Sequence, residues 1–332
     1  MKVILQFRDL LGILINLLVI GHAWTQVPTS NQPWAPPAEL PAASTRSIAI
    51  TIDDLPFVGY GAPLSEMEKG TDKILAALSK YDVTAVGFVS GESVMIPGEI
   101  DRRLALLNRW LSAGHELGNH TYSHLDFSLV SMDDFTADII KAEVPLQLLQ
   151  KPLEQTGRYF RFPMNHTGKT AVERDAMDSF LKQRGYVAVP FTVENEDYLF
   201  AQLYQNAEQK GDLDLVQRIR DAYLEFATSK MAYMEKVSQR LFKREIPQIL
   251  LLHANALNGD ALDILLDQLH SRGYQFISLA AAMADSAYLQ PQDYIGRFGP
   301  SWLFRWALNR GQEEIWRGDP DPPVWIQELA KK

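Results

Sequence analysis

The sequence of 332 residues contains no cysteine. Disulfide bonds, thiolate metal ligands and a cysteine nucleophile are therefore all excluded. A chain of this length can bury a large apolar core, so even an exported protein of this size does not require disulfides. Any metal ion that this chain binds must be held by histidine and carboxylate side chains.

Positive charge is also in short supply. The chain has 32 Lys and Arg residues against 41 Asp and Glu residues, a formal net charge of −9. Nucleic-acid binding depends on clustered basic residues, so this balance argues against a nucleic-acid partner. It does not argue against neutral sugars. The apolar fraction of 46% is ordinary for a soluble globular protein.

Only the N-terminus carries a long apolar run. Residues 10–21 are almost entirely apolar and follow the basic residues Lys2 and Arg8. The run is short for a transmembrane helix and is followed by small residues, so residues 1–25 are predicted to be a signal peptide. We expect an exported protein, periplasmic or secreted, with no stable membrane span after processing. An uncleaved N-terminal anchor is the alternative. Residues 26–46, rich in Pro, Ser, Thr and Ala, are predicted to form an extended linker.

From residue 47 onward, short apolar strands alternate with helical patterns. The alternation is clearest at the strand candidates 47–54, 83–90 and 249–253 and the helix candidates 65–80 and 259–272. It predicts a parallel α/β fold, and about seven such units favour a distorted (β/α) barrel over an open sheet. Further strands are predicted at 116–119, 159–162, 186–191 and 274–278, and further helices at 99–113 and 132–150.

Two segments depart from this alternation. Residues 200–245 carry no strand signal and show a helical apolar stripe, which predicts a helical insertion between two barrel strands. It would pack against the barrel, or alternatively form a wall of a substrate cleft. Residues 286–332 are rich in Trp, Arg and Pro and are predicted to form a C-terminal extension of irregular structure and short helices. The main domain is thus expected at 47–285.

Two adjacent carboxylates, Asp53 and Asp54, close the first predicted strand. Functional sites of parallel α/β folds form at the carboxyl ends of the strands. Strand pairing breaks there, so both side chains can reach one pocket. The alternative is that one of them caps the following turn, as aspartate often does.

His120 and His124 are four residues apart, a spacing that places two side chains on one face of a helical turn, where they can share a metal ion. With one carboxylate they make a two-histidine, one-aspartate set that leaves positions open for water and substrate. The spacing alone recurs by chance. Its occurrence together with Asp53 and Asp54, in a chain of 7 histidines, strengthens the hypothesis.

Two more strand ends carry polar residues. Arg161 would keep a neighbouring carboxylate ionised and oriented. A surface ion pair is the alternative, and it suits Arg158 better. His253 closes an apolar strand, where a histidine is costly unless it is hydrogen-bonded or functional. A satisfied core histidine is the alternative there.

These motifs resemble those of the polysaccharide deacetylase family, the NodB-like deacetylases of carbohydrate esterase family four. The resemblance runs in order from about residue 47 to residue 280. A further family motif, Asp followed by Trp, is best matched by residues 194–198, where Tyr198 takes the place of Trp. A solvated acidic loop is the alternative for that stretch. The other matching segments are Thr51-Ile52-Asp53-Asp54, His120 to His124, Arg161-Phe162-Pro163 and Leu251-Leu252-His253.

The resemblance implies a divalent metal ion, usually zinc, held by Asp54, His120 and His124. The metal would polarise the carbonyl of the substrate and lower the pKa of a water bound to it toward about 7. Ligation of one of the two adjacent carboxylates separates its role from that of the other.

The resemblance also implies roles for five other residues. Asp53 would be the general base, held by Arg161. His253 would be the general acid for the leaving amine, with Asp197 orienting it. The backbone N–H of Met164 would donate to the oxyanion.

The implied function is removal of N-acetyl groups from a glycan, such as a chitin-like oligomer or peptidoglycan N-acetylglucosamine. An O-acetyl esterase acting on a polysaccharide such as acetylxylan is the nearest alternative. A catalytically weak glycan-binding protein is an alternative from another class, against which the intact set of acidic and histidine residues argues.

Overall fold

The computed structural model describes residues 46–59, 61–149 and 158–331. The predicted signal peptide and all but the last residue of the predicted linker lie outside the described residues. Among the described residues, no helix combines the length and the apolar character needed to cross a membrane.

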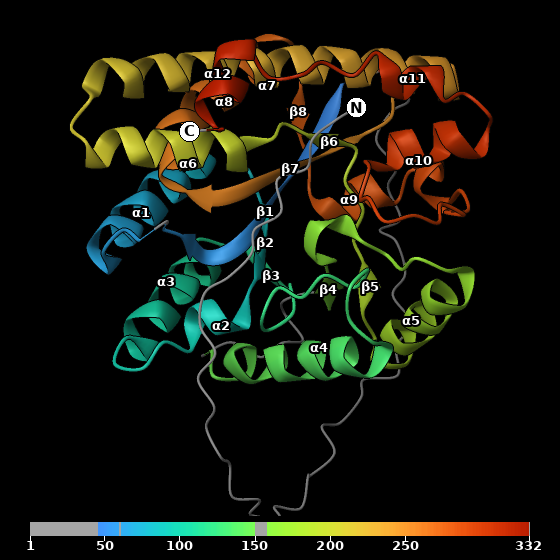
Figure 1. The fold of residues 1–332 in the computed structure, drawn as a ribbon, viewed down its shortest axis with the longest axis horizontal. Coiled ribbons are helices and arrows are strands. Elements are labelled where there is room, and N and C mark those ends of the chain that lie inside the picture. The colour runs from blue at the N-terminus through green and yellow to red at the C-terminus, as the bar shows by residue number, and fades with distance from the viewer. Residues whose placement is uncertain (1–45, 60, 150–157, 332) are drawn as a thin grey trace, which may run out of the picture. The chain divides into compact units, whose positions relative to one another are not determined.

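The centre of the fold is a parallel sheet that curls around its own axis (Figure 1). Seven strands run in the order β5-β4-β3-β2-β1-β7-β6, and an eighth, β8, pairs with the start of β1. The sheet is an incomplete barrel, which confirms the predicted distorted (β/α) barrel. The strands are β1 Ser47–Val58, β2 Val86–Val89, β3 Glu116–Asn119, β4 Tyr159–Phe160, β5 Val187–Ala188, β6 Val193–Glu194, β7 Gln248–Asn255 and β8 Gln275–Phe276.

Helices surround this sheet on its outer side (Figure 1). Several begin at a Ser, Thr, Asp or Asn whose side chain accepts the N–H three residues later, as Ser131 does for Asp134 and Asn255 does for Asn258. The helices are α1 Leu64–Lys80, α2 Gly91–Val94, α3 Ile100–Ser112, α4 Met132–Gln147, α5 Ala171–Gln183, α6 Asp197–Gln209, α7 Leu213–Phe242, α8 Ala256–Ser271, α9 Leu279–Met283, α10 Trp302–Asn309, α11 Glu314–Arg317 and α12 Val324–Leu329, with short 3₁₀ turns η1 Pro163–Asn165 and η2 Ser286–Leu289.

The central strands are buried on both faces, and successive side chains belong to different cores. On β1, Ile50 and Ile52 pack in the large cluster formed with the helices, whereas Ala49 packs inside the curl of the sheet. On β7, Leu252 joins the outer cluster and Leu251 the inner one. Because side chains alternate along a strand, Asp53 of β1 and His253 of β7 also occupy inward positions, at the ends of these strands.

The predicted helical insertion corresponds to the two helices α6 and α7. Tyr223 and Met234 of α7 are buried, and Phe200 of α6 stacks on Phe226 of α7 at 5.6 Å. Figure 1 shows both helices along one side of the sheet. They pack as an outer layer against the barrel, as the apolar stripe predicts.

The C-terminal residues beyond η2 form short helices joined by irregular segments, and they pack back onto the rest of the fold. The buried Lys230 of α7 donates to Asp319 at 2.6 Å, and the guanidinium of Arg218 lies 5.0 Å from the ring of Trp325 in α12. The predicted character of this extension therefore agrees with the structure.

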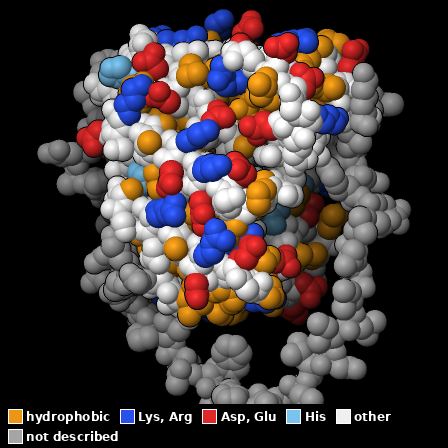
Figure 2. Space-filling view, turned by 90° about the vertical axis from the view of Figure 1, so that its left-hand side faces the viewer, with side chains coloured by type: hydrophobic (Ala, Val, Ile, Leu, Met, Phe, Trp, Pro, Cys, Tyr) orange, Lys and Arg blue, Asp and Glu red, His pale blue; other side chains and the backbone are white. Residues whose placement is uncertain are grey.

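Acidic and basic side chains are interspersed over the face seen in Figure 2. Exposed ion pairs on the helices include Lys80 with Asp263 at 2.6 Å and Arg109 with Asp72 at 2.7 Å. Pairs of this kind contribute about 0–1 kcal/mol each, so they matter for solubility more than for folding.

Candidate active site

Both carboxylates at the end of β1 reach the same cavity. Asp53 pairs in register with His253 of β7, and the register then shifts before Val58. Strict alternation would send Asp54 to the outer face, but its backbone is left-handed, with φ of 63°. This local departure from the strand turns Asp54 back toward the histidines.

The histidine pair does not lie on a helical turn, so that prediction was wrong. His120 and His124 follow β3 in an irregular loop, and both Thr121 and His124 have positive φ, 65° and 53°. The loop nevertheless brings the two imidazoles together, with ring centroids 5.0 Å apart. The Nδ1 atom of His120 donates to the carbonyl oxygen of Arg161 at 2.8 Å, which leaves Nε2 as the lone-pair atom.

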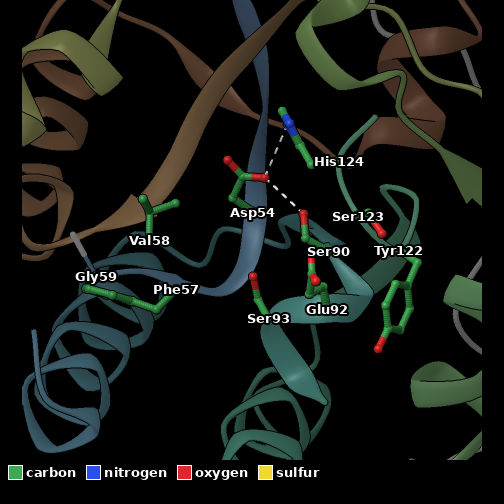
Figure 3. A pocket seen from close by; sticks show the side chains of 10 residues that line it. All are labelled: Asp54, Phe57, Val58, Gly59, Ser90, Glu92, Ser93, Tyr122, Ser123 and His124. Atoms are coloured by element: carbon green, nitrogen blue, oxygen red, sulfur yellow. Dashed lines mark hydrogen bonds and ion pairs between the residues drawn. The ribbon is translucent and has the colours of Figure 1, made fainter. Parts of the chain in front are cut away.

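Asp54, His120 and His124 form a group that fits a metal ion. Their ligand atoms lie within 4.8 Å of one another. Oδ1 of Asp54 is 3.7 Å from Nε2 of His120 and 3.6 Å from Nε2 of His124. Donors around a tetrahedral zinc ion stand about 3.4 Å apart, so this set needs little adjustment. Figure 3 shows the same oxygen of Asp54 facing His124 and accepting the Ser90 hydroxyl, at 3.0 Å.

The charges of this group also suit a cation. Burial raises the pKa of Asp54, but the facing His124 and His120 outweigh it and bring the pKa down to about 2. Burial lowers the pKa of His120, so its imidazole is neutral at pH 7. An ionised carboxylate and a neutral imidazole are the forms that ligate metal.

Asp53 lies beside this group without being part of it. Its Oδ2 is 3.7 Å from Nε2 of His120 and 3.6 Å from Nη1 of Arg161. Arg161 is itself buried and donates through Nη2 to the hydroxyl of Thr51 at 3.0 Å. Oδ1 of Asp53 is buried and accepts no hydrogen bond from any residue that the structure describes. A buried acceptor in this state calls for a partner from outside the chain, such as water or substrate.

His253 is held by Asp197, the first residue of α6. The Nδ1 atom of His253 lies 2.6 Å from Oδ1 of Asp197, and the backbone N–H of His253 donates to Oδ2 at 2.7 Å. Asn258 donates to the same Oδ2 atom. Burial lowers the pKa of His253, but the charge and hydrogen bond of Asp197 outweigh it and raise the pKa to about 10.

A cavity of about 380 Å³ adjoins these polar groups. Phe191 and Leu251 are among its lining residues, and the ring of Tyr198 lies nearly perpendicular to that of His253, at 6.1 Å between centroids and 82° between planes. Met164, in a left-handed conformation with φ of 52°, lines it from η1. The cavity thus joins a small apolar chamber to the charged groups.

Glu194 also lines this cavity, although no role follows for it from the sequence. Burial and the neighbouring carboxylate of Glu196 raise its pKa to about 7, despite the opposing charge of Lys230. The cavity therefore contains a carboxyl group that holds its proton more strongly than an exposed glutamate does.

A second cavity, of about 310 Å³, meets the first at Asp54 and His124 (Figure 3). Its other lining residues include Glu92, Tyr122 and Ser123. Cavity walls therefore extend from Asp54 and His124 in two directions.

Two residues that sequence reasoning missed hold the histidine loop. Oδ2 of Asp138, in the middle of α4, accepts the backbone N–H groups of Tyr122 at 3.0 Å and Ser123 at 2.8 Å. Oδ1 of Asn119 accepts the N–H of Thr121 at 2.8 Å. Nothing in the sequence around Asp138 distinguishes it from an ordinary surface carboxylate of a helix. Asn119 directly precedes His120, and this position could have identified it as a residue that supports the histidine loop.

The family described as polysaccharide deacetylase matches residues 41–189. This part of the chain is therefore similar to the polysaccharide deacetylase family. The matched region holds Asp53, Asp54, the histidine pair and Arg161, whereas Asp197 and His253 lie beyond it. The predicted resemblance to this family and the predicted class, a deacetylase hydrolase, are confirmed.

Relatives within this deacetylase family are distant. A peptidoglycan-N-acetylglucosamine deacetylase of Bacillus cereus is 22% identical over 72% of this chain and 69% of its own length. A chitin deacetylase of Pestalotiopsis is 26% identical over 57% of this chain, and the match spans 56% of that protein. Among solved structures, the chitin deacetylase of Colletotrichum lindemuthianum is 19% identical with a TM-score of 0.49, over 78% of this chain and 95% of that one.

Proposed function

We propose that this chain hydrolyses N-acetyl groups on a glycan, either a chitin-like oligomer or the N-acetylglucosamine of peptidoglycan. The observation that carries the proposal is the convergence of Asp53, Asp54, His120, His124 and His253 on one cavity at the carboxyl ends of the strands. The names of the Bacillus cereus and Pestalotiopsis relatives support this substrate class. The catalytic domain would be residues 47–285, with the insertion at 200–245 and the extension at 286–332.

Asp54, His120 and His124 would hold a divalent cation, for which zinc suits the two nitrogens and one oxygen. A cation bound there would polarise the scissile carbonyl and lower the pKa of water. Polarisation matters because an amide is a weak electrophile.

Asp53 would act as the general base. Its buried Oδ1 atom, which lacks a partner among the described residues, would take a proton from the attacking water. Arg161 would orient it through the contact of 3.6 Å to Oδ2. The two aspartates would thus divide the work, one holding the cation and the other moving the proton.

The tetrahedral oxyanion would accept a hydrogen bond from the backbone N–H of Met164. Met164 lines the same cavity as Leu251 and Phe191, whose apolar side chains suit an acetyl methyl group. Loss of a single oxyanion donor lowers the rate on the order of 100-fold or more, so a displaced Met164 N–H should slow the reaction strongly.

His253 would protonate the leaving nitrogen, with Asp197 keeping the imidazole charged and oriented. This pair favours an N-acetyl substrate over an O-acetyl one. An amine leaves only after it is protonated, whereas an alkoxide leaving group of an ester depends less on a strong general acid.

Export is part of the same proposal. A glycan of the cell envelope lies outside the cytoplasm, and the apolar segment within residues 1–25 would direct the chain there as a signal peptide.

The direct test is acetate release from a panel of chitooligosaccharides, peptidoglycan and acetylxylan, each with and without a chelator. We expect chelator-sensitive release from one or both N-acetylated substrates. Release from acetylxylan alone would establish the esterase instead. Binding of the glycans without release from any of them would indicate a glycan-binding protein.

A further inference from the structure

The turn that carries Met164 is strained. Met164 and Asn165 have consecutive left-handed backbones, with φ of 52° and 55°. L-residues other than glycine rarely adopt this conformation, and two in succession require support from their surroundings. Within the turn, the N–H groups of Asn165 and His166 donate to the carbonyls of Phe162 and Pro163 at 3.0 and 3.1 Å.

The support comes from the C-terminal extension. Arg305 of α10, with none of its surface exposed, donates through Nη1 to the hydroxyl of Thr167 at 2.9 Å and through Nη2 to the carbonyl of Asn165. Its Nε donates to the carbonyl of Pro300 at 2.9 Å. One guanidinium thus ties the extension to Asn165 in the turn and to Thr167 just after it.

Arg305 makes these bonds without an acidic partner, since no carboxylate in the described part of the chain forms an ion pair with it. Its guanidinium lies 4.3 Å from the ring of Trp302 and 5.0 Å from the ring of Tyr294. A buried charge needs compensation, and here backbone carbonyls and aromatic faces supply it. The forked donors of arginine, unlike a lysine ammonium, can reach three acceptors in one plane.

Gly299 closes the same contact from the other side. A Cβ atom there would lie 1.9 Å from the carbonyl oxygen of Met164 and 2.8 Å from the carbonyl carbon of Asn165. The side-chain amide of Asn165 donates through Nδ2 to the carbonyl of Pro300 at 2.9 Å. Gly299 also lines the cavity beside His253, so the extension forms part of its wall.

We propose that the C-terminal extension completes the active site, with Arg305 as a positioning residue that sets the direction of the Met164 N–H and Gly299 as the residue that allows this turn to close. The kinetic part of this proposal rests on the proposed deacetylase function. The extension lies beyond residues 41–189, the part of the chain that the family matches.

The test compares Arg305→Met with a control on the same helix. Trp306 is buried against Phe242 and Tyr288, with ring centroids at 5.4 and 5.7 Å, so Trp306→Leu disturbs α10 away from the turn. With the full-length chain, we expect Arg305→Met to lower kcat for the N-acetylated substrate about 10- to 100-fold with KM within twofold. Trp306→Leu should lower Tm at least as much and keep kcat within threefold. Equal losses of kcat in the two variants would overturn the proposal.

A second measurement does not depend on activity. Hydrogen exchange of the Asn165 and His166 amides should accelerate at least tenfold in Arg305→Met and stay unchanged in Trp306→Leu. If hydrogen exchange of these two amides were unchanged in Arg305→Met, the proposal that Arg305 holds the turn would be refuted, even if the enzyme were active. If the wild-type protein released no acetate from any substrate, the proposed function would fail, whereas the exchange result would still decide whether the extension holds the turn.

Gly299→Ala keeps the test decisive if Arg305→Met does not fold. The added methyl group should displace the Met164 carbonyl, accelerate exchange of the same two amides and lower kcat with little change in KM. Arg305→Lys should recover only part of the activity, because an ammonium cannot bind the three acceptors together. Wild-type exchange and kcat in Gly299→Ala would also refute the proposal.

Discussion

The imidazole Nδ1 of His253 and the carboxylate Oδ1 of Asp197 are 2.6 Å apart, although the two residues are separated by 55 others in the chain. The same carboxylate accepts the backbone N–H of His253, so it fixes both the ring and the strand end that carries it. A proton on Nδ1 faces Asp197, which leaves Nε2 to exchange a proton with a ligand in the cavity. This arrangement fits the proposed role of His253 as the general acid, and His253 is not among the residues grouped around the candidate metal position.

We predict that Asp197→Asn moves the alkaline limit of activity to lower pH. His253 has its pKa raised to about 10, so the acid form persists through neutral pH and is lost as pH rises past that value. Without the carboxylate, burial dominates and the pKa falls toward or below its usual 6.5. A cation at Asp54 would weaken the contribution of that aspartate but not that of Asp197. The measurement is the pH profile of kcat for acetate release.

Asn preserves the size of the side chain and can still accept the backbone N–H of His253, so the fold should survive. At pH 7 we expect a loss of about 100-fold or more in kcat, with partial recovery at lower pH. A profile that keeps its wild-type alkaline limit would contradict the assignment of His253 as the acid.

The second prediction concerns the metal. His120→Ala combined with His124→Ala should abolish stoichiometric zinc binding, because a single remaining aspartate is a weak site. Elemental analysis of the purified protein measures it directly. His270→Ala is the control: this exposed histidine of α8 lies beside Tyr81, with ring centroids 6.0 Å apart, and belongs to no metal-binding group among the described residues, so its loss should leave metal content unchanged. Undiminished metal in the double variant would reject the site.

Much of the site could be predicted because its residues lie at strand ends. Asp53 and His253 follow β1 and β7, and parallel strands bring their carboxyl ends to one edge, so sequence distance does not matter. The alternating burial of the strands even assigns both side chains to the inner face. The resemblance to the family motifs then suggested a chemical role for each of these residues.

The rest depends on backbone conformations that local patterns do not reveal. Asp54 reaches the cavity only because its φ is positive, and the spacing of His120 and His124 suggested a helix where the chain forms a loop. A four-residue spacing fits either conformation once the loop is held from outside. The support of Met164 by Arg305 was likewise beyond prediction, since it joins the turn to a segment that follows no family pattern.

Asp53→Asn should separate metal binding from proton transfer. We expect the variant to retain its metal, because Asp54 and the two histidines remain, while kcat falls about 100- to 10,000-fold as the general base is lost. Elemental analysis and acetate release on the same sample measure both. Retention of most of the turnover would show that another group takes the proton. Asp72→Asn, an exposed aspartate of α1 paired with Arg109, is the matched control and should behave as wild type.

The final prediction tests how the histidine loop is held. A single oxygen of Asp138 accepts two N–H groups of the loop between the histidines, so Asp138→Ala leaves both donors without this partner. We expect metal affinity to fall about 10- to 100-fold, as it does when groups behind metal ligands are removed. Asp138→Asn should stay close to wild type, because one amide oxygen can accept both bonds. Competition with a chelator of known affinity measures the change. Equal losses in Ala and Asn variants would mean that the negative charge, and not the two hydrogen bonds, is what the loop requires.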